Sequence, residues 1–199
     1  EEIAGRFGIL KPPPASLLDV GCGNGEFLVA ASGAGYQAIG VDLSADGVAI
    51  AKEKGLDARN VDFLNYDFGQ RFDMITMWDV MEHLRTPSLF IRRSRELLRS
   101  DGMLVLKIPS FGELNYQILR WFPTKSTVLL EAPGHVQYYS RTSLARLLAR
   151  EGFRGILWFA SKPFRSKPPT RSLKRKLSRR IQSFIAKRSG NENLYLVAS

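Results

Sequence analysis

The sequence predicts an α/β fold, a Rossmann-like three-layer αβα sandwich built on one mostly parallel sheet. Short apolar runs typical of buried strands alternate with helical segments, with about 20 residues from one strand to the next. Serine or proline signals precede helical segments, and glycines follow them. Because 199 residues are enough for one sizeable core, we expect a single domain over residues 1–199.

The expected elements follow this alternation along the chain. Strands are expected at residues 17–20, 37–41, 58–61, 72–78, 103–108, 156–159 and 194–198. Helices are expected at residues 26–32, 44–54 and 87–99, and from Ser140 or Thr142 to about residue 151, with a turn at residues 101–102. Residues 110–138 interrupt the alternation, since their aromatic residues are irregularly spaced.

A glycine-rich turn follows the first apolar run. Residues 17–25 read LLDVGCGNG, so three glycines stand at alternate positions between a strand and a helix that begins near Glu26. Without a Cβ, the backbone of such a turn can approach a ligand closely. The N-terminus of the following helix adds free N–H groups at the carboxyl end of the strand. This arrangement predicts a site for a nucleotide-like cofactor.

Acidic residues at the ends of neighbouring strands strengthen this prediction. Asp19 stands two residues before the first glycine, and Asp42 ends the second strand. A carboxylate at the latter position can accept hydrogen bonds from ribose hydroxyls. Asp62 and Phe63 follow the third strand, where an acid can bind an adenine amino group and a ring can pack on the base.

Four segments together resemble class I S-adenosylmethionine-dependent methyltransferases, in the subgroup that includes the ubiquinone-biosynthesis type. They are residues 18–25 (LDVGCGNG), 40–44 (GVDLS), 72–83 (FDMITMWDVMEH) and 98–104 (LRSDGML). The resemblance implies a seven-stranded sheet whose last strand is antiparallel. It also implies S-adenosyl-L-methionine as cofactor. The implied cofactor-binding residues are Asp19, Gly21, Cys22, Gly23, Gly25, Asp42, Leu43, Asp62, Phe63 and Trp78.

In this resemblance the glycine turn holds the methionine end of the cofactor, with Asp19 beside its amino group, and Trp78 lines the methyl-donor pocket. A dinucleotide-binding turn is disfavoured, because Glu26 would face a pyrophosphate badly. Cys22 is the single cysteine of the chain, and we interpret it as a small residue that fits a crowded turn rather than as a catalytic thiol.

The candidate acid–base groups are few, because the chain has only two histidines. His135 is the candidate catalytic residue, as a base or as a group that orients the acceptor; the alternative is a histidine that hydrogen-bonds within its loop. Asp79, Glu82 and His83 have a pattern that can hold a divalent ion, as in ubiquinone-type relatives. Asp79 replaces their usual glutamate, so we expect no metal site there.

Two segments are expected at the cofactor edge of the sheet, since loops that follow parallel strands emerge there. Residues 110–138 form a predicted lid insertion whose aromatic residues favour a hydrophobic acceptor. Residues 161–188 form a predicted basic amphipathic insertion that can lie on an anionic membrane; a helix docked on the domain and a nucleic-acid contact remain open. Eleven Lys and Arg and one Glu in residues 161–199 account for the whole net charge of +10.

The expected function is methyl transfer to a small, hydrophobic or lipid-like acceptor at oxygen or nitrogen, by in-line displacement. An RNA or protein methyltransferase that uses the basic segment as a substrate arm is one alternative. A module that binds S-adenosylmethionine without turnover is another. A single cysteine, a start unlike a signal peptide and the lack of an 18-residue apolar run predict a cytoplasmic protein, peripheral to a membrane in one interpretation. Oligomeric state is not indicated.

Overall fold

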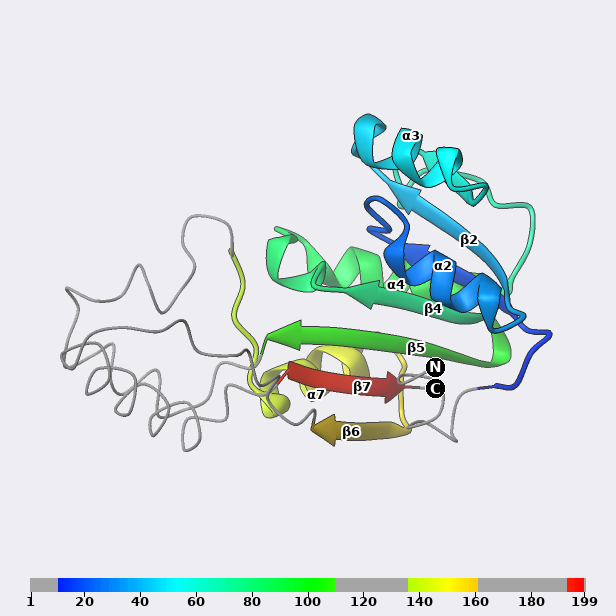
Figure 1. Ribbon diagram of the computed structural model, residues 1–199. Helices are drawn as coiled ribbons and strands as arrows, with labels where there is room; N and C mark the ends of the chain where they lie inside the picture. Colours follow the sequence, from blue (N-terminus) through cyan, green and yellow to red (C-terminus); the bar gives the residue numbers. More distant parts are fainter. Residues whose placement is uncertain (1–10, 110–135, 161–192, 199) are drawn as a thin grey trace, which may run out of the picture.

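The structure, a computed structural model, describes residues 11–109, 136–160 and 193–198 (Figure 1). Most of the predicted lid and all of the basic segment 161–188 lie outside the described residues. No helix within the described ranges is long and apolar enough to cross a membrane.

One sheet organises the chain, in the strand order β3-β2-β1-β4-β5-β7-β6. Strands β3, β2, β1, β4 and β5 pair in parallel, which confirms the predicted Rossmann-like fold with a mostly parallel sheet. β7 lies between β5 and β6 and is antiparallel to both. The strands are β1 (Ser16–Val20), β2 (Gln37–Asp42), β3 (Asp57–Asn60), β4 (Phe72–Trp78), β5 (Leu98–Pro109), β6 (Ile156–Ala160) and β7 (Asn193–Ala198).

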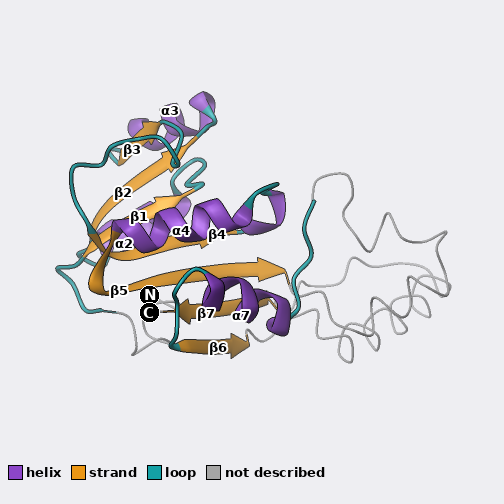
Figure 2. Ribbon diagram, turned by 180° about the vertical axis from the view of Figure 1, so that it is seen from behind, coloured by secondary structure: helices purple, strands orange, loops and turns teal. Residues whose placement is uncertain are grey.

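Helices cover both faces of the sheet. Figure 1 shows α2 (Glu26–Gly33) and α3 (Ala45–Glu53) on one face, and Figure 2 shows α4 (Pro87–Leu97) and α7 (Arg141–Arg150) on the other. The sheet accordingly divides the core. Leu17 packs with Ala31 of α2, whereas its neighbour Leu18 belongs to the larger cluster on the other face, because successive side chains of a strand point to opposite faces.

Two serines begin helices as predicted. The Ser44 hydroxyl accepts a 3.1 Å hydrogen bond from Gly47 N and caps α3. The Ser140 hydroxyl accepts a 3.1 Å hydrogen bond from Ser143 N, which identifies Ser140 rather than Thr142 as the cap of α7.

The helix–strand junction before β5 differs from the prediction. α4 ends at Leu97 and β5 begins at the next residue, whereas the sequence predicted a helix to residue 99 and a strand from 103. Phe72 pairs with Leu98 but Met74 pairs with Met103, so β5 accommodates three extra residues against β4. The predicted turn at residues 101–102 is therefore a bulge within the strand.

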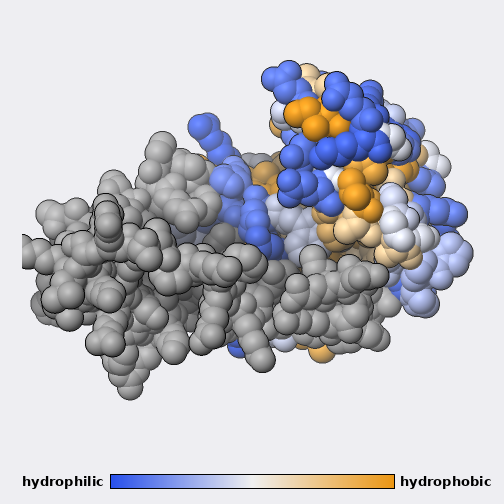
Figure 3. Space-filling view, in the orientation of Figure 1, coloured by the Kyte–Doolittle hydropathy of each residue, from blue (hydrophilic) through white to orange (hydrophobic). Residues whose placement is uncertain are grey.

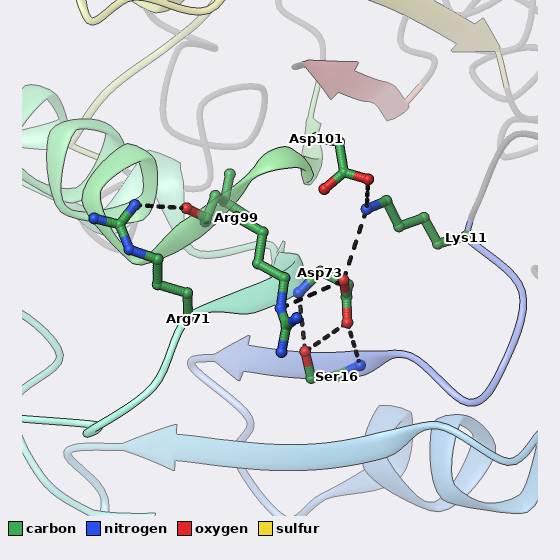
Figure 4. Close-up of polar contacts among 7 residues, drawn as sticks. Lys11, Ser16, Arg71, Asp73, Arg99 and Asp101 are labelled. Carbon is green, nitrogen blue, oxygen red and sulfur yellow. Dashed lines mark hydrogen bonds and ion pairs between the residues drawn. The ribbon is translucent and has the colours of Figure 1, made fainter.

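A polar network joins β1, β4 and β5 at the amino end of the sheet, opposite the glycine turn (Figure 4). Asp73 accepts hydrogen bonds from Ser16 N (2.9 Å) and Ser16 Oγ (2.7 Å). Lys11 and Arg99 each approach its carboxylate to 3.6 Å, and Lys11 also pairs with Asp101 at 2.6 Å. Burial alone would raise the pKa of Asp73, but the Ser16 hydrogen bonds and the two cations outweigh it and lower that pKa.

Candidate functional site

The three glycines of the turn adopt left-handed backbone, with φ of 76° at Gly21, 52° at Gly23 and 81° at Gly25. A Cβ on Gly21 would come within 2.5 Å of Val80, and one on Gly25 within 2.5 Å of Leu56. Only at Gly23 would a Cβ meet open space. Backbone conformation therefore favours glycine at all three positions, and protein packing also requires it at Gly21 and Gly25. The close approach of this turn to a ligand stays a prediction.

The turn is fixed from β2 and α3. Gly23 N donates a 2.8 Å hydrogen bond to Asp42 Oδ2, and Asp42 Oδ1 accepts one of 2.7 Å from Ser44 N. Lys54, which follows α3, donates a 2.8 Å hydrogen bond from its ammonium to the carbonyl of Asn24. The Asp42 carboxylate thus shapes the turn as well as facing the sheet edge where a ribose is expected.

A cavity of about 460 Å³ lies beside the turn and over the ends of β4 and β5. It brings together four residues that the sequence placed in the site, Asp19, Gly21, Cys22 and Trp78. Phe27 forms part of the wall, with its ring centroid 4.7 Å from that of Trp78. The other lining residues are Asn24, Glu26, Ala30 and Lys107.

Sequence reasoning missed Phe27 and Lys107. Phe27 stands in the first turn of α2, directly after the glycine turn, so its place near a ligand could have been inferred from proximity alone. Lys107 is the one charged residue in the apolar run 103–109 of β5. A charged residue in such a run indicates a position at an edge or a cavity, because lysine is rarely fully buried.

Asp19 is the buried acid of this cavity, with 1% of its side chain exposed. It accepts a 2.7 Å hydrogen bond from Thr76 Oγ1 on the adjacent strand. Burial raises the pKa of Asp19 to about 7; the Thr76 hydrogen bond opposes this rise and the charge of Asp42 adds to it. A buried carboxyl that titrates near neutrality is suited to a cationic partner that restores its ionised form.

Six predicted cofactor residues lie outside the lining of that cavity: Gly23, Gly25, Asp42, Leu43, Asp62 and Phe63. Leu43 is 75% exposed, directly after β2. The Asp62 carboxylate turns its own loop, accepting hydrogen bonds from Leu64 N (3.0 Å) and Asn65 Nδ2 (2.5 Å). Figure 3 shows apolar surface as separate patches on the part of the molecule that carries α2 and α3. The exposed apolar side chains of the described chain include Val29, Leu43 and Ile50.

Phe63 occupies the core rather than the surface. Its side chain is 3% exposed, and its ring stacks on Phe90 with centroids 5.5 Å apart. The contacts of its side chain are therefore with the protein. A role in packing on an adenine stays a prediction for this residue.

Cys22 is 7% exposed and lines the cavity. Burial, followed by the charges of Asp19 and Asp42, raises the pKa of its thiol to about 12. The thiolate is thus disfavoured at neutral pH, which agrees with the interpretation of Cys22 as a packing residue rather than a nucleophile.

The acidic segment after β4 forms other contacts than those of a metal site. Asp79 pairs with the ammonium of Lys107, and Glu82 is 2% exposed in the short helix η1 (Met81–His83). In the part of the chain that the structure describes, no group of three or more His, Cys, Asp or Glu side chains could hold a metal ion. The expectation of no metal site at Asp79, Glu82 and His83 stays a prediction.

His135 lies outside the described residues. The residues that follow it are anchored to η1: Val136 N and Gln137 N donate to the Glu82 carbonyl at 2.9 and 3.0 Å. The Tyr139 hydroxyl donates to the Met81 carbonyl at 3.3 Å. These bonds attach the chain after residue 135 to the turn that follows β4.

Parallel strands that end at a glycine turn, with a buried acid beneath it, define a Rossmann-like cofactor-binding domain. The sequence profile of the methyltransferase domain family matches residues 2–157, and the chain belongs to this family. A ubiquinone biosynthesis O-methyltransferase of Nitrobacter winogradskyi is 33% identical over 121 residues, 54% of this chain and 46% of that protein. A mitochondrial one of Candida albicans is 32% identical over 130 residues, 60% of this chain and 38% of that protein.

The chain spans about half the length of the curated relatives it matches. Among solved structures, a SAM-dependent methyltransferase from Archaeoglobus fulgidus matches with a TM-score of 0.70 at 20% identity, over 99% of this chain and 91% of that chain. Phosphoethanolamine N-methyltransferase 2 of Haemonchus contortus, solved with S-adenosyl-L-methionine, matches with a TM-score of 0.67 at 19% identity, over 99% of this chain and 51% of that chain. These two likenesses show the fold. The family match thus assigns the chain to the methyltransferase domain family, and the solved structures agree with it in fold.

Proposed function

We propose that this chain transfers a methyl group from S-adenosylmethionine to a small, hydrophobic or lipid-like acceptor, at oxygen or nitrogen. The observation that carries the proposal is the cavity beside the glycine turn, with buried Asp19 in its lining and the aromatic pair Phe27 and Trp78 in its wall. Its volume of about 460 Å³ lies in the range of small-molecule sites.

The residues present fit the donor. Each Asp42 carboxylate oxygen accepts one hydrogen bond from the protein, and a carboxylate oxygen has two lone pairs, so both can also accept from ribose hydroxyls. Exposed Leu43 beside it offers apolar surface for an adenine. Asp19 offers a carboxylate to an ammonium where both are removed from water, which strengthens their attraction.

Bound S-adenosylmethionine supplies an electrophilic methyl group on a sulfonium. The chain holds the amino-acid end through Asp19 and the glycine turn. The rings of Phe27 and Trp78 exclude water from one side of the cavity. Such positioning contributes much of the rate of an in-line displacement. We propose that His135 orients the acceptor or removes its proton; the hydrogen bond from the next residue, Val136, to η1 supports this.

The acceptor class follows from residues 110–138, which come after β5 and thus leave the sheet at its cofactor edge. Their aromatic and aliphatic residues favour a hydrophobic acceptor. We further propose a cytoplasmic protein whose basic segment 161–188 contacts anionic membrane surfaces. Sedimentation with anionic vesicles should exceed that with neutral ones; equal binding, or none, contradicts the electrostatic contact.

Calorimetry with S-adenosylmethionine and S-adenosylhomocysteine tests the donor, and we expect binding of both. Incubation with methyl-labelled S-adenosylmethionine and separated cellular lipids and metabolites tests the acceptor. We expect label in an apolar fraction. Label in RNA or protein instead would identify the acceptor class as wrong, and binding without any transfer would identify a non-catalytic module.

A further inference from the structure

Lys107 places a positive charge in a cavity whose other charged lining residues are the acids Asp19 and Glu26. It lies on β5 directly opposite Trp78 of β4 in the strand register. Side chains at paired positions of neighbouring strands point to the same face of a sheet, and both residues line the cavity beside the glycine turn. The site described so far gives this lysine no role.

Asp79 holds the Lys107 ammonium at the edge of the cavity. The two side chains form an ion pair, and Asp79 N donates a 3.0 Å hydrogen bond to the Lys107 carbonyl. With φ of 54°, Asp79 is the one non-glycine residue of the described chain in left-handed backbone, a conformation that is unfavourable for a residue with a Cβ. The turn after β4 thus brings a carboxylate back onto the lysine.

The ion pair leaves Lys107 able to bind a second anion. Its side chain is 23% exposed, and that of Asp79 is 43% exposed, so neither group is sealed from the cavity or solvent. An ammonium has three donors, and hydrogen bonding to one carboxylate does not exhaust them. The amine is therefore held in place while part of its hydrogen-bonding capacity remains open.

The charges that line the cavity match a zwitterion. Asp19 and Glu26 are its acids, and Lys107 is the one cation among the described lining residues. The amino-acid end of S-adenosylmethionine carries an ammonium and a carboxylate on the same carbon. If Asp19 faces the ammonium, the carboxylate needs a cation within the same cavity, because an unpaired carboxylate there would lose its hydration.

We propose that Lys107 binds the carboxylate of the cofactor's amino-acid end and so selects S-adenosylmethionine and S-adenosylhomocysteine over analogues that lack that carboxylate. This inference rests on the proposed function. It adds a carboxylate-binding group to the cofactor site and assigns the Asp79 side chain to holding that group in place.

The test is a cycle of two proteins and two ligands measured by calorimetry. The ligands are S-adenosylhomocysteine and its decarboxylated analogue, the thioether that carries a 3-aminopropyl chain. The proteins are the unmodified chain and Lys107→Met. A lost hydrogen bond to a charged group corresponds to about 10- to 100-fold in affinity, so we expect Lys107→Met to weaken S-adenosylhomocysteine binding by that factor and the analogue by less than about twofold.

Lys52→Met, at an exposed lysine of α3, is the matched control and should change neither affinity. Lys107→Gln serves as a second variant, with circular dichroism to establish folding. Equal losses for both ligands, or no loss for S-adenosylhomocysteine, overturn the role of Lys107 while the proposed function stands. If the unmodified chain binds neither ligand, the proposed function fails, and this inference with it.

Discussion

Thr76 donates a 2.7 Å hydrogen bond to Asp19 across the central strands β1 and β4. Both side chains are buried, with exposures of 2% and 1%. The bond offsets part of the effect of burial, which nonetheless raises the pKa of Asp19 to about 7. The acid of the cofactor cavity is therefore poised between its two protonation states near neutral pH.

The first prediction concerns stability against pH in the ligand-free protein. The pKa of Asp19 rises from 3.8 to about 7 on folding, so its protonated form contributes stability below pH 4 that is lost as pH rises towards 7. This difference between the two pKa values corresponds to roughly 4 kcal/mol in the free energy of unfolding. Asp19→Asn should remove this loss, and urea unfolding at pH 4 to 8 measures it. Parallel pH profiles for the two proteins would contradict the raised pKa.

A second prediction follows from the same pair. Thr76→Val keeps the shape of the side chain but removes the hydrogen bond that lowers the pKa of Asp19, so that pKa should rise further. Because an ammonium ligand needs the ionised acid, affinity for S-adenosylhomocysteine should increase with pH up to about 7 in the unmodified protein. In Thr76→Val the increase should continue to higher pH. Calorimetry from pH 5.5 to 8 locates both midpoints, and identical midpoints would count against the assignment.

The third prediction separates the glycines of the turn. A Cβ at Gly21 would lie 2.5 Å from a methyl group of Val80, whereas one at Gly23 meets nothing within 4 Å. Gly23→Ala should cost only the left-handed backbone term of about 1 kcal/mol. Gly21→Ala adds overpacking, typically another 1–3 kcal/mol. Urea unfolding of both variants gives the order, and an equal or reversed order would show that the packing around Gly21 yields freely.

A fourth prediction concerns the amino end of the sheet. Asp73 accepts two hydrogen bonds from buried Ser16, and its lowered pKa means that its stabilising effect is present above pH 4 and lost as pH falls further. Asp73→Asn should lower the free energy of unfolding at pH 7 by about 1–3 kcal/mol and by less at pH 3. Asp101→Asn, at an exposed acid of the same network, is the control with a small effect (Figure 4). Cofactor affinity should stay unchanged in both, because the network lies at the far end of the strands.

The fifth prediction tests the adenosine end of the site. Leu43 is 75% exposed, so Leu43→Ser should leave the free energy of unfolding within about 0.5 kcal/mol. Loss of its apolar contact should weaken S-adenosylhomocysteine binding several-fold. Ile50→Ser makes a comparable change at another exposed apolar side chain and serves as the control. Equal affinities in all three proteins would remove Leu43 from the site.

The local signals of the sequence were enough to predict the parallel sheet, the glycine turn and the helix start at Ser44, and to limit the start of the later helix to Ser140 or Thr142. Strand periodicity, glycine and a capping hydroxyl act within a few residues, so they can be read without a structure. The junction at β5 was predicted less well. A glycine after an aspartate indicates a turn, but only pairing with β4 decides that this turn is a bulge inside a strand.

Local sequence patterns are enough to identify the family-level features: the alternation of strands and helices, Asp19 before the turn, Asp42 at the end of β2 and the three glycines. Tertiary structure decided what surrounds them. It buried Asp19 against Thr76, placed Phe63 in the core, packed Gly21 against Val80 and set Lys107 beside Trp78 with Asp79 as its partner. These are contacts between residues far apart in the chain, and burial, charge and packing at such contacts depend on which strands become neighbours.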